Sequence, residues 1–413
     1  MKRQPVITGL GIVSPIGIGV EKFWVAALAG RSGIGTPTLF DSSKLPLECR
    51  IVGEVHDFNP RLWMPAPTAK IAGRFSQFAV AAAKMALQDG HLSLADTDTD
   101  RFMVSIGSSM SGLTDVEQPN FVAFLHGDDV RPWTVLEYPG HAATSHVAIS
   151  VGARGQTTSP ATACVAGLDS IAWAAEKISR AQATAVLAGA TETPLSPACM
   201  EAFRALGALA SWPGLPAEAS RPFDKLRCGL VLAEGAAILI VEDEENARAR
   251  GAPIYARILG YASATEGAHM RNVDATGEPA ARAMTMAMDG AGLTRNDIDY
   301  ICAHGNSLVD YDASETAGIK LTLKERAWSV PVSSIKSMCG QALAASGAMQ
   351  TVATCLAIRD GIVPPTINYS VRDPACDLDY VPNIARRVRV RTALIHAQSI
   401  GGSHSALILG APC

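Results

Sequence analysis

Cys164 stands in a run of small residues, Ser159-Pro-Ala-Thr-Ala-Cys-Val-Ala-Gly167, where the pattern predicts that an apolar strand ends and an apolar helix begins. The N-terminus of a helix offers unpaired N–H groups and the positive end of its dipole, and both stabilise a thiolate over a thiol. The small neighbours leave room for a substrate carbonyl group. Cys164 is therefore a candidate nucleophile for acyl transfer. The alternative is a core cysteine, because free Cys is among the most buried residue types.

Two more residues that could do chemistry also follow apolar strands. His304 lies in the run Cys-Ala-His-Gly-Asn-Ser, and Lys336 lies in the run Ser-Ser-Ile-Lys-Ser-Met. Loops at the C-terminal ends of strands can direct side chains into a crevice of an α/β fold. Asp312 and Glu315 could neutralise Lys336. Together with Cys164 these residues suggest one shared site for nucleophilic catalysis, although a loop histidine alone is more often structural.

The composition predicts a compact protein without a general attraction to polyanions. The chain has 413 residues, of which 48% are hydrophobic and 18% charged, and its net charge is −4. We therefore expect no nucleic-acid partner and no membrane span, because the apolar runs are too short to cross a bilayer. Nine cysteines at irregular spacing, with no signal peptide before them, indicate the reducing cytoplasm. No cluster has metal-ligand spacing, so we expect no metal.

Short apolar strands alternate with Ala-rich helices along the chain, which is typical of an α/β fold. The alternation restarts after residue 251, so we predict two similar halves, 1–251 and 252–413. Residues 115–138 and 211–227 lack a clear period and are interpreted as surface excursions. The predicted strands are 5–9, 102–107, 184–189, 236–241, 254–262, 300–303 and 393–398, and the predicted helices are 20–28, 74–89, 169–180, 197–206, 277–291, 312–323 and 344–359.

Seven motifs span almost the full length of the chain: Thr8-Gly-Leu-Gly-Ile-Val-Ser-Pro15, Thr162-Ala-Cys164, Ser220-Arg-Pro-Phe-Asp224, Ala303-His-Gly305, Ser334-Ile-Lys-Ser337, Val363-Pro-Pro-Thr-Ile-Asn368 and Cys376-Asp-Leu-Asp-Tyr380. In these motifs the chain resembles the elongating branch of the β-ketoacyl-carrier-protein synthases. The resemblance implies the thiolase fold, an α/β fold of two pseudo-duplicated halves in a layered α-β-α-β-α core. It also implies a dimer.

The resemblance also implies roles for individual residues. In that family a cysteine takes an acyl chain from the phosphopantetheine arm of an acyl carrier protein, and no cofactor is bound. Two histidines then hold the malonyl thioester oxygen during decarboxylation. Cys164 matches the nucleophile, His304 the first histidine and Lys336 the lysine that organises the site, whereas Gln341 stands at the second histidine. A neutral amide can donate a hydrogen bond to an enolate but cannot titrate, and losing such a donor typically costs on the order of 3 kcal/mol.

Further departures from the family fall in the region that receives malonyl and the carrier arm. Asn306, Leu308 and Arg271 occupy positions where the family has groups such as threonine that bind the arm. Ile400 replaces the aromatic gate over the nucleophile. Met110 resembles the residue that borders the acyl pocket. This set of departures resembles the chain-length factor, the ketosynthase-like partner of a catalytic ketosynthase.

Three functions remain open at this point. The favoured one is a chain-length-factor-like subunit that forms a heterodimer with a catalytic β-ketoacyl synthase in a type II fatty acid, polyketide or polyene system. The second is a homodimeric synthase active in its own right, with Cys164 as nucleophile and Gln341 as an imperfect donor. The third is acyl transfer without decarboxylation, for which Cys164 and His304 suffice. The first is favoured because several malonyl-site groups are lost, against one retained thiol.

Overall fold

The computed structural model describes residues 3–93 and 97–412, and an eleven-stranded mixed sheet runs through it. The first half of the chain contributes, from the centre outward, β1, β8, β7, β5 and β6, and the second half contributes β9, β15, β14, β10 and β11. If the five strands of each half are numbered 1 to 5 along the chain, their order from the centre of the sheet outward is 1, 5, 4, 2, 3 in both halves. The bounds are β1 (Pro5–Ser14), β5 (Phe102–Gly107), β6 (Thr157–Thr158), β7 (Ala185–Glu192), β8 (Gly235–Asp243), β9 (Ala256–Thr265), β10 (Tyr300–Cys302), β11 (Val332–Ser333), β14 (Thr392–Gln398) and β15 (Ser403–Gly410).

This shared strand order confirms the prediction of two pseudo-duplicated halves. β1 and β9 pair antiparallel at the centre, through Val6 with Arg257 and Ile7 with Ala256, so the two halves share one sheet. The division into 1–251 and 252–413 remains our proposal. The eleventh strand of the sheet, β2 (Gly17–Ile18), pairs with β1 and lies outside this repeat. Two separate two-stranded sheets are formed by β3 (Ile34–Gly35) with β4 (Val52–Gly53) and by β12 (Ile362–Val363) with β13 (Arg386–Arg387).

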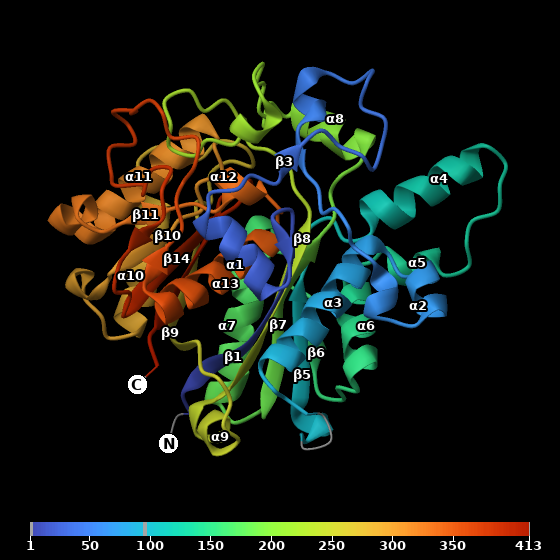
Figure 1. The fold of residues 1–413 in the computed structure, drawn as a ribbon, viewed down its shortest axis with the longest axis horizontal. Helices are drawn as coiled ribbons and strands as arrows, with labels where there is room; N and C mark the ends of the chain where they lie inside the picture. The colour runs from blue at the N-terminus through green and yellow to red at the C-terminus, as the bar shows by residue number, and fades with distance from the viewer. Residues whose placement is uncertain (1–2, 94–96, 413) are drawn as a thin grey trace.

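Helices cover and separate the two halves of the sheet, which gives five layers (Figure 1). One outer layer packs on the first half, a central pair lies between the halves, and a second outer layer packs on the second half. In that order the layers hold α3 (Arg74–Asp89) with α6 (His141–Val151), α7 (Ala166–Ser179) with α13 (Ala345–Asp360), and α10 (Glu278–Gly290) with α11 (Val309–Leu323). The remaining helices are α1 (Val20–Leu28), α2 (Ala66–Ile71), α4 (Gln118–Leu125), α5 (Thr134–Glu137), α8 (Pro197–Ala205), α9 (Glu244–Ala249) and α12 (Lys336–Cys339).

Burial on both faces explains the composition of the central strands. All ten residues of β1 are buried, so its sequence is nearly continuous in apolar and small residues instead of alternating. α3 lies very close to it, because a Cβ on Gly11 would come within 1.8 Å of the carbonyl oxygen of Ala82. Glycine at this position therefore allows the helix and the strand to approach.

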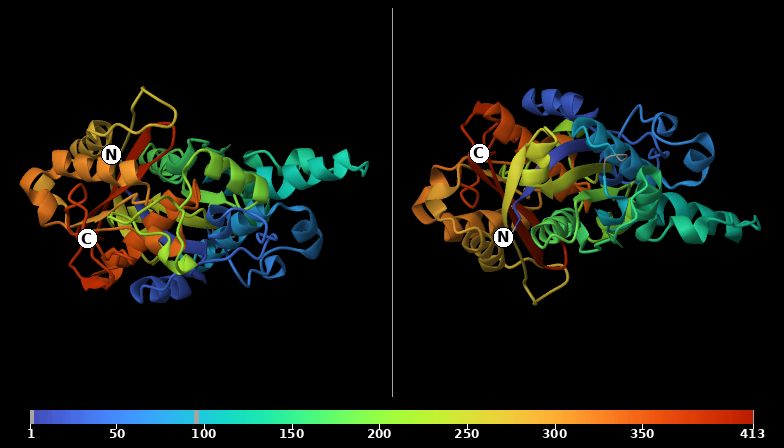
Figure 2. Two further views of the ribbon diagram at one scale, coloured as in Figure 1. Left: turned by 90° about the horizontal axis from the view of Figure 1, so that it is seen from above. Right: turned by 90° about the horizontal axis from the view of Figure 1, so that it is seen from below.

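Residues 115–138 form a surface excursion as predicted (Figure 2), but one that contains helices, which the lack of a clear period did not indicate. The segment 113–138, called the arm from here on, contains a π-helical turn (Leu113–Glu117), α4 and α5. The arm projects from the body of the molecule in both views of Figure 2. Its large exposed apolar side chains are Phe121, Val122, Phe124, Leu125, Val130, Trp133, Val135, Leu136 and Tyr138.

Three other features differ from the sequence-based expectations. α6 and β15 were not predicted, because polar residues interrupt the apolar pattern of both segments. The segment 211–227 is largely irregular as expected, but residues 220–224 are buried instead of lying at the surface. Phe223 within it stacks on Tyr380 at 4.1 Å between ring centroids. Within residues 3–93 and 97–412, no helix has the length and apolar character to span a bilayer.

Candidate active site

Cys164 lies in a 3₁₀ turn, Ala163–Val165, immediately before α7. Ala163 adopts a left-handed conformation with φ of 53°. An alanine in this region is strained, and such strain persists where the surroundings fix a turn. The turn places Cys164 between the sheet and the central helices, where its exposed fraction is 7%.

The thiol of Cys164 is protonated at neutral pH, which corrects our expectation of a thiolate. Burial raises its pKa to about 11, even though the hydrogen bond from Gln341 and the charge of Lys336 act in the opposite direction. The helix dipole is a weak influence by comparison, because desolvation penalises the charged form most in a buried site. A thiolate at Cys164 therefore requires a base or a bound substrate.

The alkylation of Cys164 should reveal this protonation state. With a pKa of about 11, the thiolate fraction rises about tenfold for each pH unit between pH 7 and pH 10. The rate of iodoacetamide modification at the peptide that contains Cys164, measured by mass spectrometry, should rise in step. Gln341→Leu should slow it further, because it removes a hydrogen bond that lowers the pKa. A rate that levels off below pH 8 would contradict the buried-thiol assignment.

His304 is held as a neutral imidazole with a free donor. Its Nδ1 accepts a hydrogen bond from the backbone N–H of Gln398 at 3.3 Å, so the ring proton lies on Nε2. Burial and the nearby charge of Lys336 keep the pKa of His304 well below 6.5. Within the described part of the chain, the buried Nε2 has no hydrogen-bond partner. It is therefore an unpaired buried donor.

Two carboxylates hold the loop that carries His304. Glu315 accepts the backbone N–H groups of His304 at 2.7 Å and of Gly305 at 2.8 Å. Asp312 accepts those of Asn306 and Ser307 at 3.0 and 3.2 Å. Gly305 has a φ of 38°, and a Cβ there would lie 2.7 Å from the ring of Phe223, so only glycine fits this turn.

Lys336 ties the His304 loop to the central helix α13. Its Nζ donates to the carbonyl oxygen of His304 at 2.6 Å and to Oε1 of Gln350 at 3.1 Å. Burial lowers its pKa to about 8, while the charge of Glu315 partly offsets that effect. Among the ion pairs of residues 3–93 and 97–412, none joins Lys336 to Asp312 or Glu315. The expected neutralisation thus acts through space, and the carboxylates bind backbone N–H groups instead.

Gln341 lies against the nucleophile and is almost fully engaged. Its side-chain amide donates a hydrogen bond to Cys164, and its Oε1 accepts one from Ser346 at 3.2 Å. Its backbone N–H donates to Val231 at 2.8 Å, and its carbonyl accepts from Ala233 at 3.0 Å. The amide is consequently fixed toward the sulfur.

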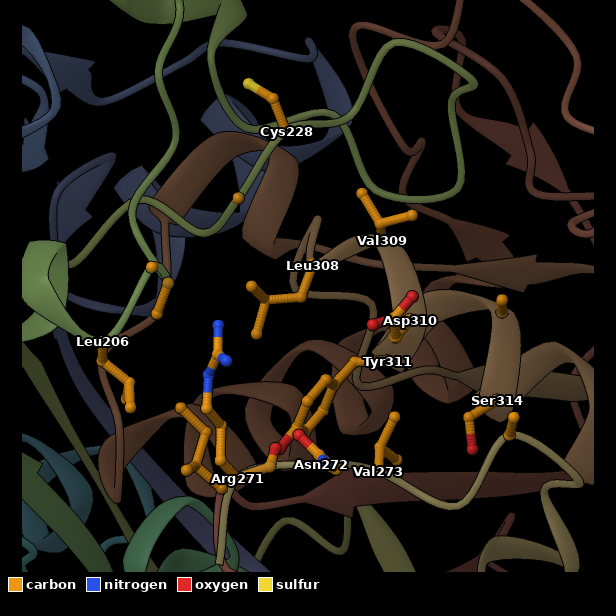
Figure 3. A pocket seen from close by; sticks show the side chains of 16 residues that line it. Leu206, Cys228, Arg271, Asn272, Val273, Leu308, Val309, Asp310, Tyr311 and Ser314 are labelled. Carbon is orange, nitrogen blue, oxygen red and sulfur yellow. The ribbon is translucent and has the colours of Figure 1, made fainter.

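Two adjacent cavities with shared lining residues lie at Cys164 and beside it. The inner one, of 290 Å³, is lined by Cys164, Gln341, Met110 and Asn306 among others. The outer cleft, of 520 Å³, is open to solvent, and Figure 3 shows Arg271, Leu308 and Tyr311 around it. Leu206 and Ile400 line both cavities.

The structure brings together every site residue that the sequence predicted, in three groups. Met110, Cys164, Asn306 and Gln341 line the inner cavity, Arg271 and Leu308 line the outer cleft, and Ile400 lies between them. His304, Lys336, Asp312 and Glu315 form the buried support behind. No group of three or more His, Cys, Asp or Glu side chains within the described residues could hold a metal ion.

Sequence reasoning missed Glu192, which lies at the end of β7. Its buried carboxylate accepts the backbone N–H groups of Ser109 at 2.7 Å and Met110 at 2.9 Å, and burial raises its pKa to about 7. It thereby fixes the position of Met110 beside the inner cavity. An acidic residue that closes an otherwise apolar strand is the signal that could have identified it.

Comparison with known proteins gives a consistent result. The family model "Beta-ketoacyl synthase, N-terminal domain" matches residues 3–247, and "Beta-ketoacyl synthase, C-terminal domain" matches residues 255–370. The chain is 39% identical to 3-oxoacyl-[acyl-carrier-protein] synthase 2 of Coxiella burnetii, covering 99% of this chain and 98% of that one. It is 40% identical to the tetracenomycin polyketide synthase ketoacyl synthase alpha subunit of Streptomyces glaucescens, covering 100% and 98%.

Two solved structures share the fold over the whole chain. One is the ishigamide ketosynthase/chain length factor, with a TM-score of 0.92, 32% identity and coverage of 100% of both chains. The other is a type II polyketide synthase acyl carrier protein in complex with its ketosynthase bound to the hexaketide, with a TM-score of 0.92, 36% identity and the same coverage. These matches are consistent with the thiolase fold.

Proposed function

Because this chain belongs to the β-ketoacyl synthase family, we propose that it is the chain-length-factor-like partner of a catalytic ketosynthase in a type II fatty acid or polyketide system. In this role it forms a heterodimer, and its residues help to bound the cavity that receives the growing chain. The substrates arrive on the phosphopantetheine arm of an acyl carrier protein.

The observation that carries this proposal is the engagement of Gln341. Decarboxylation of a malonyl thioester places negative charge on the thioester oxygen, and the reaction depends on preorganised donors at that position. His304 offers one free N–H, on Nε2. The amide of Gln341 donates one N–H to Cys164 and its oxygen accepts from Ser346, so the side chain is turned toward the sulfur, and as a neutral group it is a weaker second donor than an imidazole at this position. The site therefore retains the architecture of a ketosynthase without the full set of hydrogen-bond donors that decarboxylation needs.

The arm supports the assignment of a subunit interface. It exposes a set of aromatic and aliphatic side chains, of which Phe124 is 61% and Leu136 is 62% exposed. Isolated soluble proteins rarely expose apolar patches of several hundred square ångströms, and such patches mark interaction surfaces. The ishigamide ketosynthase/chain length factor, which shares this fold, is a pairing of the proposed kind.

The two cavities support delivery on a carrier arm. The outer cleft shares Leu206 and Ile400 with the inner cavity that holds Cys164, so the two cavities lie side by side. A long, thin substrate arm fits such a pair of cavities, and a branched aliphatic side chain at Ile400 forms a smaller barrier than an aromatic one. Leu308 offers the phosphopantetheine group of the carrier protein only apolar contact.

A second candidate function is acyl transfer at Cys164 itself. It is favoured by the contact between Cys164 and Gln341, because a donated hydrogen bond lowers the pKa of the thiol and so assists thiolate formation. In this function the Nε2–H of His304 would donate to the thioester oxygen during exchange without decarboxylation.

Purification with and without a partner tests the proposal. We expect the chain alone to form no condensation product from an acyl and a malonyl carrier protein. Co-expressed with a catalytic ketosynthase of a type II system, it should form a 1:1 complex that makes a product of defined chain length, measured by mass spectrometry. A purified homodimer that condenses on its own at ketosynthase rates would overturn the proposal.

A further inference from the structure

Two histidines on neighbouring strands lie between two glutamates in the interior of the second half. His396 on β14 and His404 on β15 are 0% and 1% exposed, and their rings stack at 5.6 Å between centroids. Nδ1 of His396 lies 2.6 Å from Oε1 of Glu315, and Nε2 of His396 lies 3.4 Å from Nδ1 of His404. Nε2 of His404 lies 3.0 Å from Oε1 of Glu266. The four side chains form one continuous chain of hydrogen bonds.

Each end of this chain reaches a part of the candidate active site. At one end Glu315 accepts the backbone N–H groups of His304 and Gly305. At the other end Glu266 accepts the backbone N–H of Asp274, and its own N–H donates to the carbonyl of Gly402. The loops that carry Arg271 and Ile400, which line the outer cleft, are therefore linked to the His304 loop through the interior.

Counting protons constrains the state of the four groups. Three hydrogen bonds need three hydrogens, but two neutral imidazoles supply only one each and two carboxylates supply none. Glu315 already accepts two backbone N–H groups, so it is a carboxylate, and His396 donates to it from Nδ1. Nε2 of His396 then accepts from Nδ1 of His404, which leaves Nε2 of His404 as an acceptor. With both imidazoles neutral, the third hydrogen comes from Glu266 as a carboxylic acid. The competing state, an imidazolium at His396 between two carboxylates, holds the same three hydrogens and is distinguished by the charge on the ring.

We propose that Glu266, His404, His396 and Glu315 form a buried proton relay that stores one proton on Glu266 and positions His304 through Glu315. The directions of the pKa shifts agree with this geometry: burial raises the pKa of Glu266 and lowers that of His404 to about 3. In this state the relay carries one negative charge, on Glu315, near the ammonium of Lys336. His396, His404 and Glu266 are positioning residues, because none of them reaches the substrate cavities.

Strand β14 would then fix His304 from two directions. Its backbone at Gln398 donates to the Nδ1 of His304, while its side chain at His396 supports the carboxylate that holds the His304 backbone. Charged and titratable groups face the relay from the elements packed around it. They are Lys336 at the start of α12, His304 after β10, Tyr311 and Asp312 on α11, Asp274 after β9, and Arg282 on α10.

Histidine NMR on the full chain, alone or with its partner subunit, tests the proton positions. The chain has nine histidines, so ¹⁵N-histidine labelling gives few signals, and His396→Asn and His404→Asn assign two of them. We expect each ring to carry a single proton, on Nδ1, as the hydrogen-bond order of the relay requires. A cationic ring, or a proton on Nε2, at either residue would overturn the relay.

The stability of Glu266→Gln gives an independent test with a definite sign. A glutamine amide donates to His404 as the protonated acid does, so the variant should keep the fold. Because the native pKa of Glu266 is raised above its ordinary value of 4.5, the native state binds more protons than the unfolded state above that pH. The unfolding midpoint of the wild type, minus that of Glu266→Gln, should therefore fall as pH rises from 5 to 8. A difference that rises instead indicates an ionised Glu266 and contradicts the proposal.

The positioning role rests on the proposed part of His304 in the site, and it has its own readout. His396→Asn retains an amide donor for Glu315, whereas His396→Leu removes it. The ¹⁵N signals of His304 should show the Nε2–H form in the wild type and in His396→Asn, and a mixture of tautomers in His396→Leu. Unchanged His304 signals in His396→Leu would reject the positioning role. Neither result depends on whether the chain condenses acyl groups, so a failure here is distinct from a failure of the proposed function.

Discussion

Replacing Gln341 with histidine is expected to raise the rate at which the chain releases CO₂ from a malonyl carrier protein by about 10²-fold to 10³-fold. Preorganised donors at the developing enolate are worth factors of this size. An imidazole at this position could donate from Nε2 toward the cavity that holds Cys164, beside the free N–H of His304. The backbone of Gln341 is fixed by Val231 and Ala233, so the substitution changes the side chain alone.

The matched control for this gain is Gln341→Asn, which keeps an amide and should leave the rate unchanged. A second control, Gln341→His in a His304→Ala background, should lose most of the gain because one donor again remains. Release of CO₂ from labelled malonyl carrier protein measures all of these variants. No gain in a folded Gln341→His variant would show that the weak second donor is not what limits decarboxylation.

Charged substitutions on the arm are expected to abolish the heterodimer. The double variant Phe124→Asp and Leu136→Asp should weaken association with the catalytic ketosynthase by about 100-fold or more, since truncated hot-spot residues cost 2 kcal/mol or more each. Both side chains are more than 60% exposed in the chain alone, so the variant should fold. Analytical ultracentrifugation of the mixed subunits measures the affinity.

An exposed apolar residue away from the arm provides the control. Ile384 is 78% exposed, and Ile384→Asp should leave the affinity unchanged. If the arm variant binds as tightly as the wild type, the arm is not the interface and its exposed side chains need another explanation.

Local patterns predicted the scaffold and the chemistry-bearing loops well. Cys164, His304 and Lys336 each follow a strand, and the loops at strand ends converge as the α/β pattern implies. The helices of the arm were missed because α4 has only eight residues and its apolar side chains follow no clear helical period. The predicted ionisation state of Cys164 was wrong because the burial of the thiol depends on the packing of distant segments around it.

The buried relay was beyond the reach of local patterns for a geometric reason. His396 and His404 lie on different strands. They meet only because the register of β14 and β15 pairs Gln398 with His404, which makes His396, two residues before Gln398, the diagonal neighbour of His404. Glu266 and Glu315 come from other parts of the chain, so nothing in the local sequence joins them. The sequence likewise could not show that Asp312 and Glu315, whose charges act on Lys336 through space, bind the backbone N–H groups of the His304 loop.

The central claim is tested most directly by determining which subunit of the heterodimer supplies the nucleophile for condensation. In a purified complex with a catalytic ketosynthase, Cys164→Ala in this chain and a substitution of the partner's own nucleophile are compared by the amount of condensation product. The account predicts that Cys164→Ala retains condensation, whereas loss of the partner's nucleophile removes it. Loss of condensation in the Cys164→Ala complex, with activity retained when the partner's nucleophile is removed, would contradict the account and make this chain the catalytic subunit.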